Sequence, residues 1–193
     1  MKKLLSLIMA LVLVLSMCLC MTACKNDDSK KDFTDADTKN VTPLTEQDIR
    51  ILMEKNLDCY FLFYVAPLNN TTQQNSDGYY GTDGSYMKTY DELVELLNAT
   101  YIKDKANELL NYPSSDMPLY KNVNNSIFVY PPVITPVDYD VMWDDTYTIN
   151  MEQISATEYA LTFTTYDFDS NEYTAKGNIA FENGKWRFAD VIC

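Results

Sequence analysis

The chain has 193 residues, of which 15 are Lys or Arg, 28 are Asp or Glu and none is His, so its formal net charge is −13 at pH 7. This acidic excess argues against nucleic-acid binding, which needs Lys and Arg to contact the phosphates. It favours a basic protein partner, a cation or solubility alone. The lack of His removes the usual general base and the commonest zinc ligand, so we expect no enzyme, no cofactor and no metal site.

The first residues have the pattern of a cleavable export signal. Lys2 and Lys3 carry the only charges, an uncharged run from residue 4 to 20 follows, and small residues then lead into a cysteine. The quartet Met21–Cys24 resembles the lipobox of bacterial lipoproteins, which implies that diacylglycerol is attached to Cys24 and that the chain is cleaved before it. An uncleaved membrane helix is the alternative, because the run is close to the roughly 20 residues that span a bilayer.

The sequence therefore divides into three predicted parts. Residues 1–23 are the signal peptide, residues 24–41 hold the lipidated Cys24 and a polar, flexible tether, and residues 42–193 form a single domain. We expect this domain to lie at the cell membrane, outside the cytoplasm, and to touch the membrane through its lipid anchor only.

The first half of the domain predicts helices. Apolar residues recur at helical spacing from Pro43 to Ala66, with Thr42 as the expected N-cap and Pro67 as the stop. Residues 69–88 predict a loop, either a solvated excursion or a binding loop.

Two shorter helices are predicted next. A capping box at Thr89–Glu92 begins one helix, and a further helix is expected from Tyr101 to Asn111.

The second half predicts strands, because apolar side chains alternate there. The strands centre on Ile127–Val133, Thr146–Gln153, Tyr159–Phe163, Tyr173–Phe181 and Trp186–Phe188. Asn183 and Gly184 predict a two-residue hairpin turn, and Gly177 an irregularity in its strand. Helices followed by an antiparallel meander indicate an α+β fold, in which N-terminal helices pack on a curved antiparallel sheet of cystatin-like or NTF2-like kind.

One acidic and aromatic cluster is the candidate partner-binding site. Its residues are Asp138, Tyr139, Asp140, Trp143, Asp144 and Asp145. Aromatic side chains framed by charge are typical of protein-binding hot spots. A solvated loop with Trp143 turned into the core is the alternative. A second acidic run, residues 167–172, has the opening of a calcium loop but predicts a polar hairpin turn.

Two cysteines, Cys59 and Cys193, lie in the predicted domain. They could pair if the first helix packs on the last strand. We favour two separate thiols, because sequence spacing does not show proximity.

From residue 43 to 193 the layout is similar to the IseA family of secreted inhibitors of peptidoglycan-cleaving DL-endopeptidases. The residues that carry the resemblance are Tyr90–Leu97, Ile102–Leu110 and Pro118–Tyr120, followed by the strand-rich half. The resemblance implies a non-catalytic α+β domain that binds a hydrolase of NlpC/P60 type and blocks its cleft.

Three functions follow as hypotheses. The first is a membrane-anchored inhibitor of a cell-wall hydrolase. The second is a lipoprotein that binds a small ligand in the concave face of its sheet. The third is an NTF2-like enzyme that uses a Tyr and an Asp, which requires a buried carboxyl of raised pKa.

Overall fold

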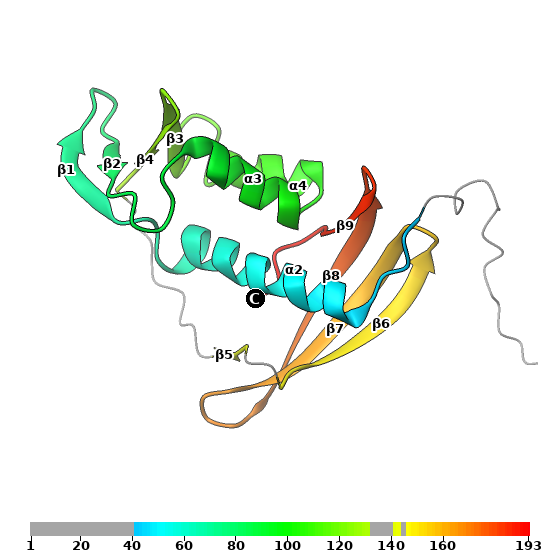
Figure 1. Cartoon of the computed structure of the whole chain (residues 1–193). Helices are drawn as coiled ribbons and strands as arrows, with labels where there is room; N and C mark the ends of the chain where they lie inside the picture. Colours follow the sequence, from blue (N-terminus) through cyan, green and yellow to red (C-terminus); the bar gives the residue numbers. More distant parts are fainter. Residues whose placement is uncertain (1–40, 132–140, 144–145) are drawn as a thin grey trace, which may run out of the picture. The chain divides into compact units, whose positions relative to one another are not determined.

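The computed structural model describes residues 41–131, 141–143 and 146–193 (Figure 1). The chain divides into two units, and the second, Phe33–Cys193, holds all of these residues. The predicted signal peptide, Cys24 and nearly all of the tether lie outside the described residues. Within the described ranges, none of the helices has both the length and the apolar character needed to cross a membrane.

Helices form where the apolar spacing predicts them. Helix α2 spans Glu46–Tyr60 and continues as a π-helical turn, η1, over Phe61–Val65. Helices α3 and α4 span Tyr90–Thr100 and Lys103–Leu110. The three predicted helices are therefore confirmed, with boundaries that differ by a few residues.

The predicted N-cap of the first helix is wrong. Thr45 caps α2 instead of Thr42: its hydroxyl accepts from the Asp48 amide at 3.2 Å, and the Asp48 carboxylate accepts from the Thr45 amide at 3.0 Å. This reciprocal pair satisfies two donors that the first turn leaves free. The Thr42 carbonyl instead accepts from Nε1 of Trp186 at 2.7 Å.

A small antiparallel sheet occupies the middle of the chain. Its strand order is β1-β2-β4-β3, with bounds Asn70–Gln74, Tyr80–Thr82, Ser126–Val129 and Tyr120–Val123. The prediction of an irregular loop over residues 69–88 is therefore wrong for β1 and β2. These strands are short and largely polar, so they lack the apolar alternation that marks a half-buried strand.

The larger sheet is an antiparallel meander, β6-β7-β8-β9, with β5 beside β6 on the same edge of β7. The bounds are Val141–Met142, Thr148–Ser155, Glu158–Asp167, Glu172–Glu182 and Lys185–Phe188 for β5 to β9. The hairpin turn at Asn183 and Gly184 is confirmed, and both residues have positive φ angles, 52° and 79°.

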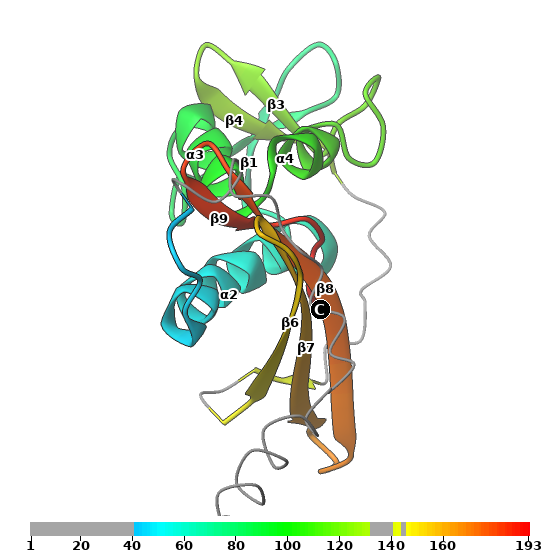
Figure 2. The same ribbon diagram turned by 90° about the vertical axis from the view of Figure 1, so that its right-hand side faces the viewer.

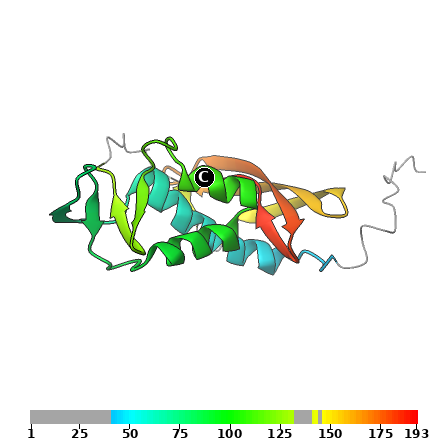
Figure 3. The same cartoon turned by 90° about the horizontal axis from the view of Figure 1, so that it is seen from above.

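The α+β class predicted from the sequence is confirmed, although the strands form two sheets and not one. Helix α2 lies against one face of the larger sheet, and α3 and α4 lie above α2 as drawn in Figure 1, with α3 next to β9 (Figures 2 and 3). One cluster of buried apolar side chains joins the helices to both sheets. Leu161, Phe163 and Ile179 are buried in it, whereas Met151 on the edge strand β6 is 39% exposed.

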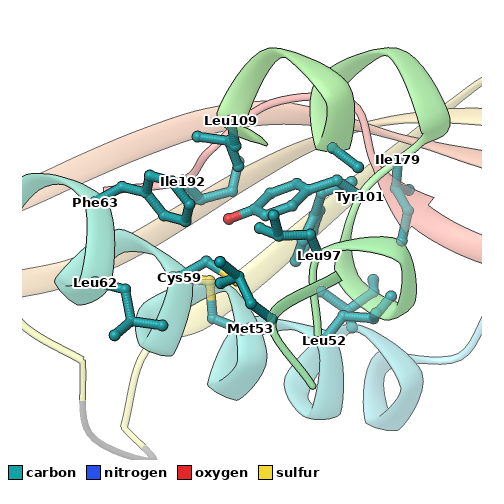
Figure 4. Close-up of a cluster of buried hydrophobic side chains, with 14 of the residues drawn as sticks. Leu52, Met53, Cys59, Leu62, Phe63, Leu97, Tyr101, Leu109, Ile179 and Ile192 are labelled. Atoms are coloured by element: carbon teal, nitrogen blue, oxygen red, sulfur yellow. The ribbon is translucent and has the colours of Figure 1, made fainter. Parts of the chain in front are cut away.

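Asn56 of α2 joins three parts of this core, although it is polar and 0% exposed. Its Nδ2 donates to the Ile192 carbonyl at 2.6 Å, and its Oδ1 accepts from the Ile192 amide at 3.0 Å. The Tyr101 hydroxyl donates to the same Oδ1 at 2.9 Å. Figure 4 shows Tyr101 and Ile192 among the buried side chains that join α2 to α4. The amide thus binds the last residues of the chain as a neighbouring strand would.

Gly177 of β8 makes room for the same segment. A Cβ at this position would lie 2.0 Å from Cδ1 of Ile192. The predicted irregularity at Gly177 is wrong, because its pairing with Leu161 continues the regular β7–β8 register. The glycine is needed for close approach of the Ile192 side chain and not for a bulge.

We expect Asn56→Asp to make stability depend on pH. The neutral acid can still donate to the Ile192 carbonyl, whereas the ionised form is a buried charge facing that carbonyl, so burial raises the pKa of the new carboxyl above its unfolded value. The Asn56→Asp variant therefore keeps its stability relative to the wild type below about pH 4 and loses it as the pH rises through the folded-state pKa of the new carboxyl. Urea unfolding of both proteins at each pH measures this difference, and a constant difference between pH 4 and 8 contradicts it.

We expect Gly177→Ala to destabilise the fold by about 1–3 kcal/mol, because the new methyl group overlaps Ile192, whose backbone is held by Asn56. Ile192→Val removes the overlapping Cδ1, so the double variant should lose less stability than the sum of the two single changes. The matched control combines Gly177→Ala with Ile49→Val. Ile49 is also fully buried, but none of its atoms is among those nearest to a Cβ at position 177. The packing argument is contradicted if the changes in unfolding free energy add equally well in the double variant with Ile192→Val and in the one with Ile49→Val.

Candidate functional site

Trp143 is the only member of the predicted partner-binding cluster among the described residues. Asp138, Tyr139, Asp140, Asp144 and Asp145 lie outside them. The partly buried indole packs edge-on against the rings of Tyr147, Phe163 and Tyr173, at centroid distances of 5.7, 6.1 and 6.2 Å. For Trp143 the alternative interpretation, a side chain turned toward the core, is therefore the observed one.

The aromatic layer around Trp143 is tied to α2. The Arg50 guanidinium lies 4.6 Å from the centroid of the Tyr147 ring, and its Nη2 donates to the Tyr147 carbonyl at 3.1 Å. Nε1 of Trp143 is buried and has no acceptor among the residues that the structure describes. The layer anchors the start of β6 to the helix, so its role in the described part of the chain is structural.

The described core holds no catalytic carboxyl of the kind that the enzyme hypothesis requires. Its buried polar residues are Asn56, Thr100 and Thr165, none of which ionises at physiological pH. The described residues also contain no group of three His, Cys, Asp or Glu side chains placed to hold a metal ion.

The acidic run at residues 167–172 forms the predicted hairpin turn. The Asp167 carboxylate accepts from the Asn171 backbone amide at 2.8 Å and from its side-chain amide at 2.9 Å. These hydrogen bonds hold the pKa of Asp167 below its usual value, and the bond from the Asn171 side chain has the larger effect. The carboxylate therefore closes the β7–β8 turn.

Cys59 and Cys193 are free thiols, in agreement with the interpretation favoured from the sequence. Cys59 is buried, and burial raises the pKa of its thiol to about 12. Because the thiolate is the reactive form, Cys59 is a poor nucleophile at neutral pH.

The concave face of the larger sheet is filled by side chains. Leu161, Phe163, Ile179 and Phe188 are buried in the central cluster together with residues of α2. The small-ligand hypothesis placed its ligand on this face, but these side chains occupy that space.

A hollow of about 360 Å³ lies at the C-terminal end of α2, away from that face. Its lining residues are Asp58, Phe61, Leu62, Ala66, Pro67, Leu68, Asn69, Ser85 and Tyr86. Two large aromatic side chains at the hollow are exposed, Phe61 at 36% and Tyr86 at 57%. The hollow thus combines an apolar wall, two accessible rings and one carboxylate.

The walls of the hollow are held by hydrogen bonds. The buried Tyr120 hydroxyl donates to the Leu62 carbonyl at 2.7 Å and accepts from the Leu68 amide at 3.1 Å. Across the hollow, the Asp83 amide donates to the Asn69 carbonyl at 3.0 Å, and the Asp83 carboxylate accepts from the Ser85 amide at 2.9 Å. These bonds fix the spacing between the end of the helical segment and the loop that carries Tyr86.

Tyr86 and Asp58 interact at the rim of the hollow. Burial, followed by a hydrogen bond to Asp58, raises the pKa of Tyr86 to about 12. The phenol is therefore neutral at physiological pH and donates to the carboxylate, which keeps further acceptor positions open to solvent.

Sequence reasoning missed the hollow as a site. It did keep a binding loop open for residues 69–88, and this segment supplies Asn69, Ser85 and Tyr86. The contribution of Asp58 and Phe61 could not be predicted, because nothing in the sequence distinguishes them from other residues of an amphipathic helix until the loop is placed beside them.

The sequence matches no protein-family model, and no curated protein matches it significantly.

We expect one thiol of the Phe33–Cys193 unit to react with an aromatic disulfide reagent in the native state and two in urea. Cys193 is exposed, whereas the Cys59 thiol is buried and its pKa is raised to about 12. Cys59→Ala removes the thiol that reacts only after unfolding and leaves Cys193, which reacts in the native state. Rapid reaction of two thiols without denaturant contradicts the assignment.

Proposed function

We propose that this chain is a lipid-anchored, extracytoplasmic protein that binds a cell-wall peptidoglycan hydrolase of DL-endopeptidase type and inhibits it by occluding its cleft. One observation carries the proposal: the chain has 28 acidic and 15 basic residues, and none of the buried residues of the described part is a carboxylic acid. The negative charge is therefore directed at solvent, where it attracts a positively charged partner.

The cell-wall hydrolase is proposed as that partner for two reasons. Hydrolases that act on an anionic wall often carry basic surface, so an acidic inhibitor is steered toward them. The segments that resemble the IseA family, Tyr90–Leu97 and Ile102–Leu110, coincide with the adjoining helices α3 and α4. The lipobox-like quartet supports an anchor at Cys24, which keeps the domain beside the wall.

A small-ligand-binding lipoprotein is the second candidate. The hollow at the end of α2 favours it, because about 360 Å³ with an apolar wall is at the lower end of the volumes that hold small molecules. The inhibitor remains our first choice because the hollow is open to solvent at exposed aromatic side chains.

The proposal predicts that the purified Phe33–Cys193 unit slows peptidoglycan-peptide cleavage by a DL-endopeptidase from the same cell envelope. Changing Asp138, Asp140, Asp144 and Asp145 to Asn should weaken this inhibition roughly tenfold, since exposed charge pairs are each worth about 0.2–1 kcal/mol. The measurement is the inhibition constant at low and at high salt, and the wild type should lose more affinity in salt than the variant.

A variant of equal charge serves as the control. Asp116, Glu152, Asp169 and Glu172 are exposed, so changing these four to their amides alters the net charge equally. Equal weakening by both variants would show that only net charge matters and would remove the four Asp residues of the cluster as a specific binding surface. No inhibition by the wild type at saturating concentration contradicts the inhibitor function.

A further inference from the structure

We propose that the hollow at the end of α2 binds an arginine side chain from an extended segment of the partner. This inference rests on the proposed function for the existence of a basic protein partner, and it assigns the chemistry by which that partner is held. Its basis is the juxtaposition of Asp58, Tyr86 and an apolar wall in a hollow of about 360 Å³.

Asp58 supplies the negative charge. The ion pairs of the described residues are Arg50–Glu46, Lys105–Glu108 and Lys121–Asp77, so Asp58 has no basic partner within the part of the chain that the structure describes. None of the described residues that line the hollow is Lys or Arg. Asp58 is exposed at the edge of the apolar wall, so its carboxylate is accessible to an external cation.

The rest of the hollow fits the remainder of an arginine side chain. Leu62, Pro67 and Leu68 offer apolar surface to the methylene stem. Tyr86 is exposed next to the carboxylate and offers a ring on which a planar guanidinium can stack. Arginine is favoured over lysine, because its weakly hydrated fork makes a stacked contact and a bidentate bond together.

The walls of the hollow are held by hydrogen bonds within the chain itself. The Tyr120 hydroxyl joins the Leu62 and Leu68 backbones, and Asp83 joins the Asn69 and Ser85 backbones. A site with fixed walls loses little conformational entropy on binding, so even a single side chain is held measurably. The acidic surface around it adds a long-range attraction for a basic segment.

The test is an amide NMR titration of the full chain in a neutral detergent with the peptide acetyl-Ala-Arg-Ala-amide. We expect saturating shifts at Asn69, Ser85 and Tyr86. The matched peptide with citrulline, which has the shape of arginine without its charge, should leave these amides unshifted. Asp58→Asn should weaken arginine-peptide binding about fivefold, as expected for one exposed charge pair.

Glu54→Gln is the matched protein control, because it removes one exposed negative charge one turn earlier on α2 without touching the hollow. Unchanged binding in this variant supports the assignment. The inference is overturned by an absence of shifts, by equal binding of the citrulline peptide, or by equal weakening in both variants. Preferred saturation by an uncharged aromatic compound, with no response to arginine, also overturns it and favours the small-ligand candidate.

The outcomes separate this inference from the proposed function. A chain that inhibits the hydrolase but does not bind the arginine peptide overturns the assignment of the hollow alone. A chain that binds the peptide but no hydrolase overturns the inhibitor function and leaves the ligand chemistry of the hollow.

Discussion

The hydrogen bonds of Asn56 are the interaction on which the rest of the fold depends. A buried amide without partners destabilises a core, but this one satisfies the Ile192 amide and carbonyl together and also accepts from Tyr101. Three segments far apart in the sequence are thereby fixed at one point: helix α2, the residue after α3, and the end of the chain. The close approach of Ile192 to Gly177 then sets how the last residues lie on β8.

Fixing α2 in this way also positions the surface at its far end. Asp58 follows Asn56 by two residues, so it lies on the solvent side of the same helical segment when Asn56 faces the core. The π-helical turn continues the segment through Phe61 and Leu62, and Tyr120 then joins it to the chain that leads into the small sheet. The geometry of the hollow is thus a consequence of core packing.

The sequence predicts those parts of the fold whose signals are local. Apolar periodicity and a capping box located the three helices of the described residues, and Asn183-Gly184 located a hairpin, because each signal depends on a few neighbouring residues. The helix cap was misplaced by three residues, since Thr42 and Thr45 both precede acceptable first turns and only the Asp48 partner decides between them. Strands β1 and β2 and the hollow were missed because they depend on pairing between segments that no local pattern reveals. Gly177 was recognised as unusual, but its reason, a contact with Ile192, lies 15 residues away in the chain.

The division between a neutral core and an acidic exterior bears on function. The NTF2-like enzyme hypothesis requires a buried carboxyl of raised pKa, and the buried polar positions of the described core are Asn and Thr. Recognition of a cation needs the opposite arrangement, a carboxylate that stays ionised at the edge of an apolar surface. Asp58 is exposed beside Leu62 and Tyr86 at the edge of the apolar wall, which is the arrangement that the proposed arginine site uses. We propose that a chain without His uses this chemistry for binding, with its acidic surface for attraction and the aromatic hollow for selection among basic partners.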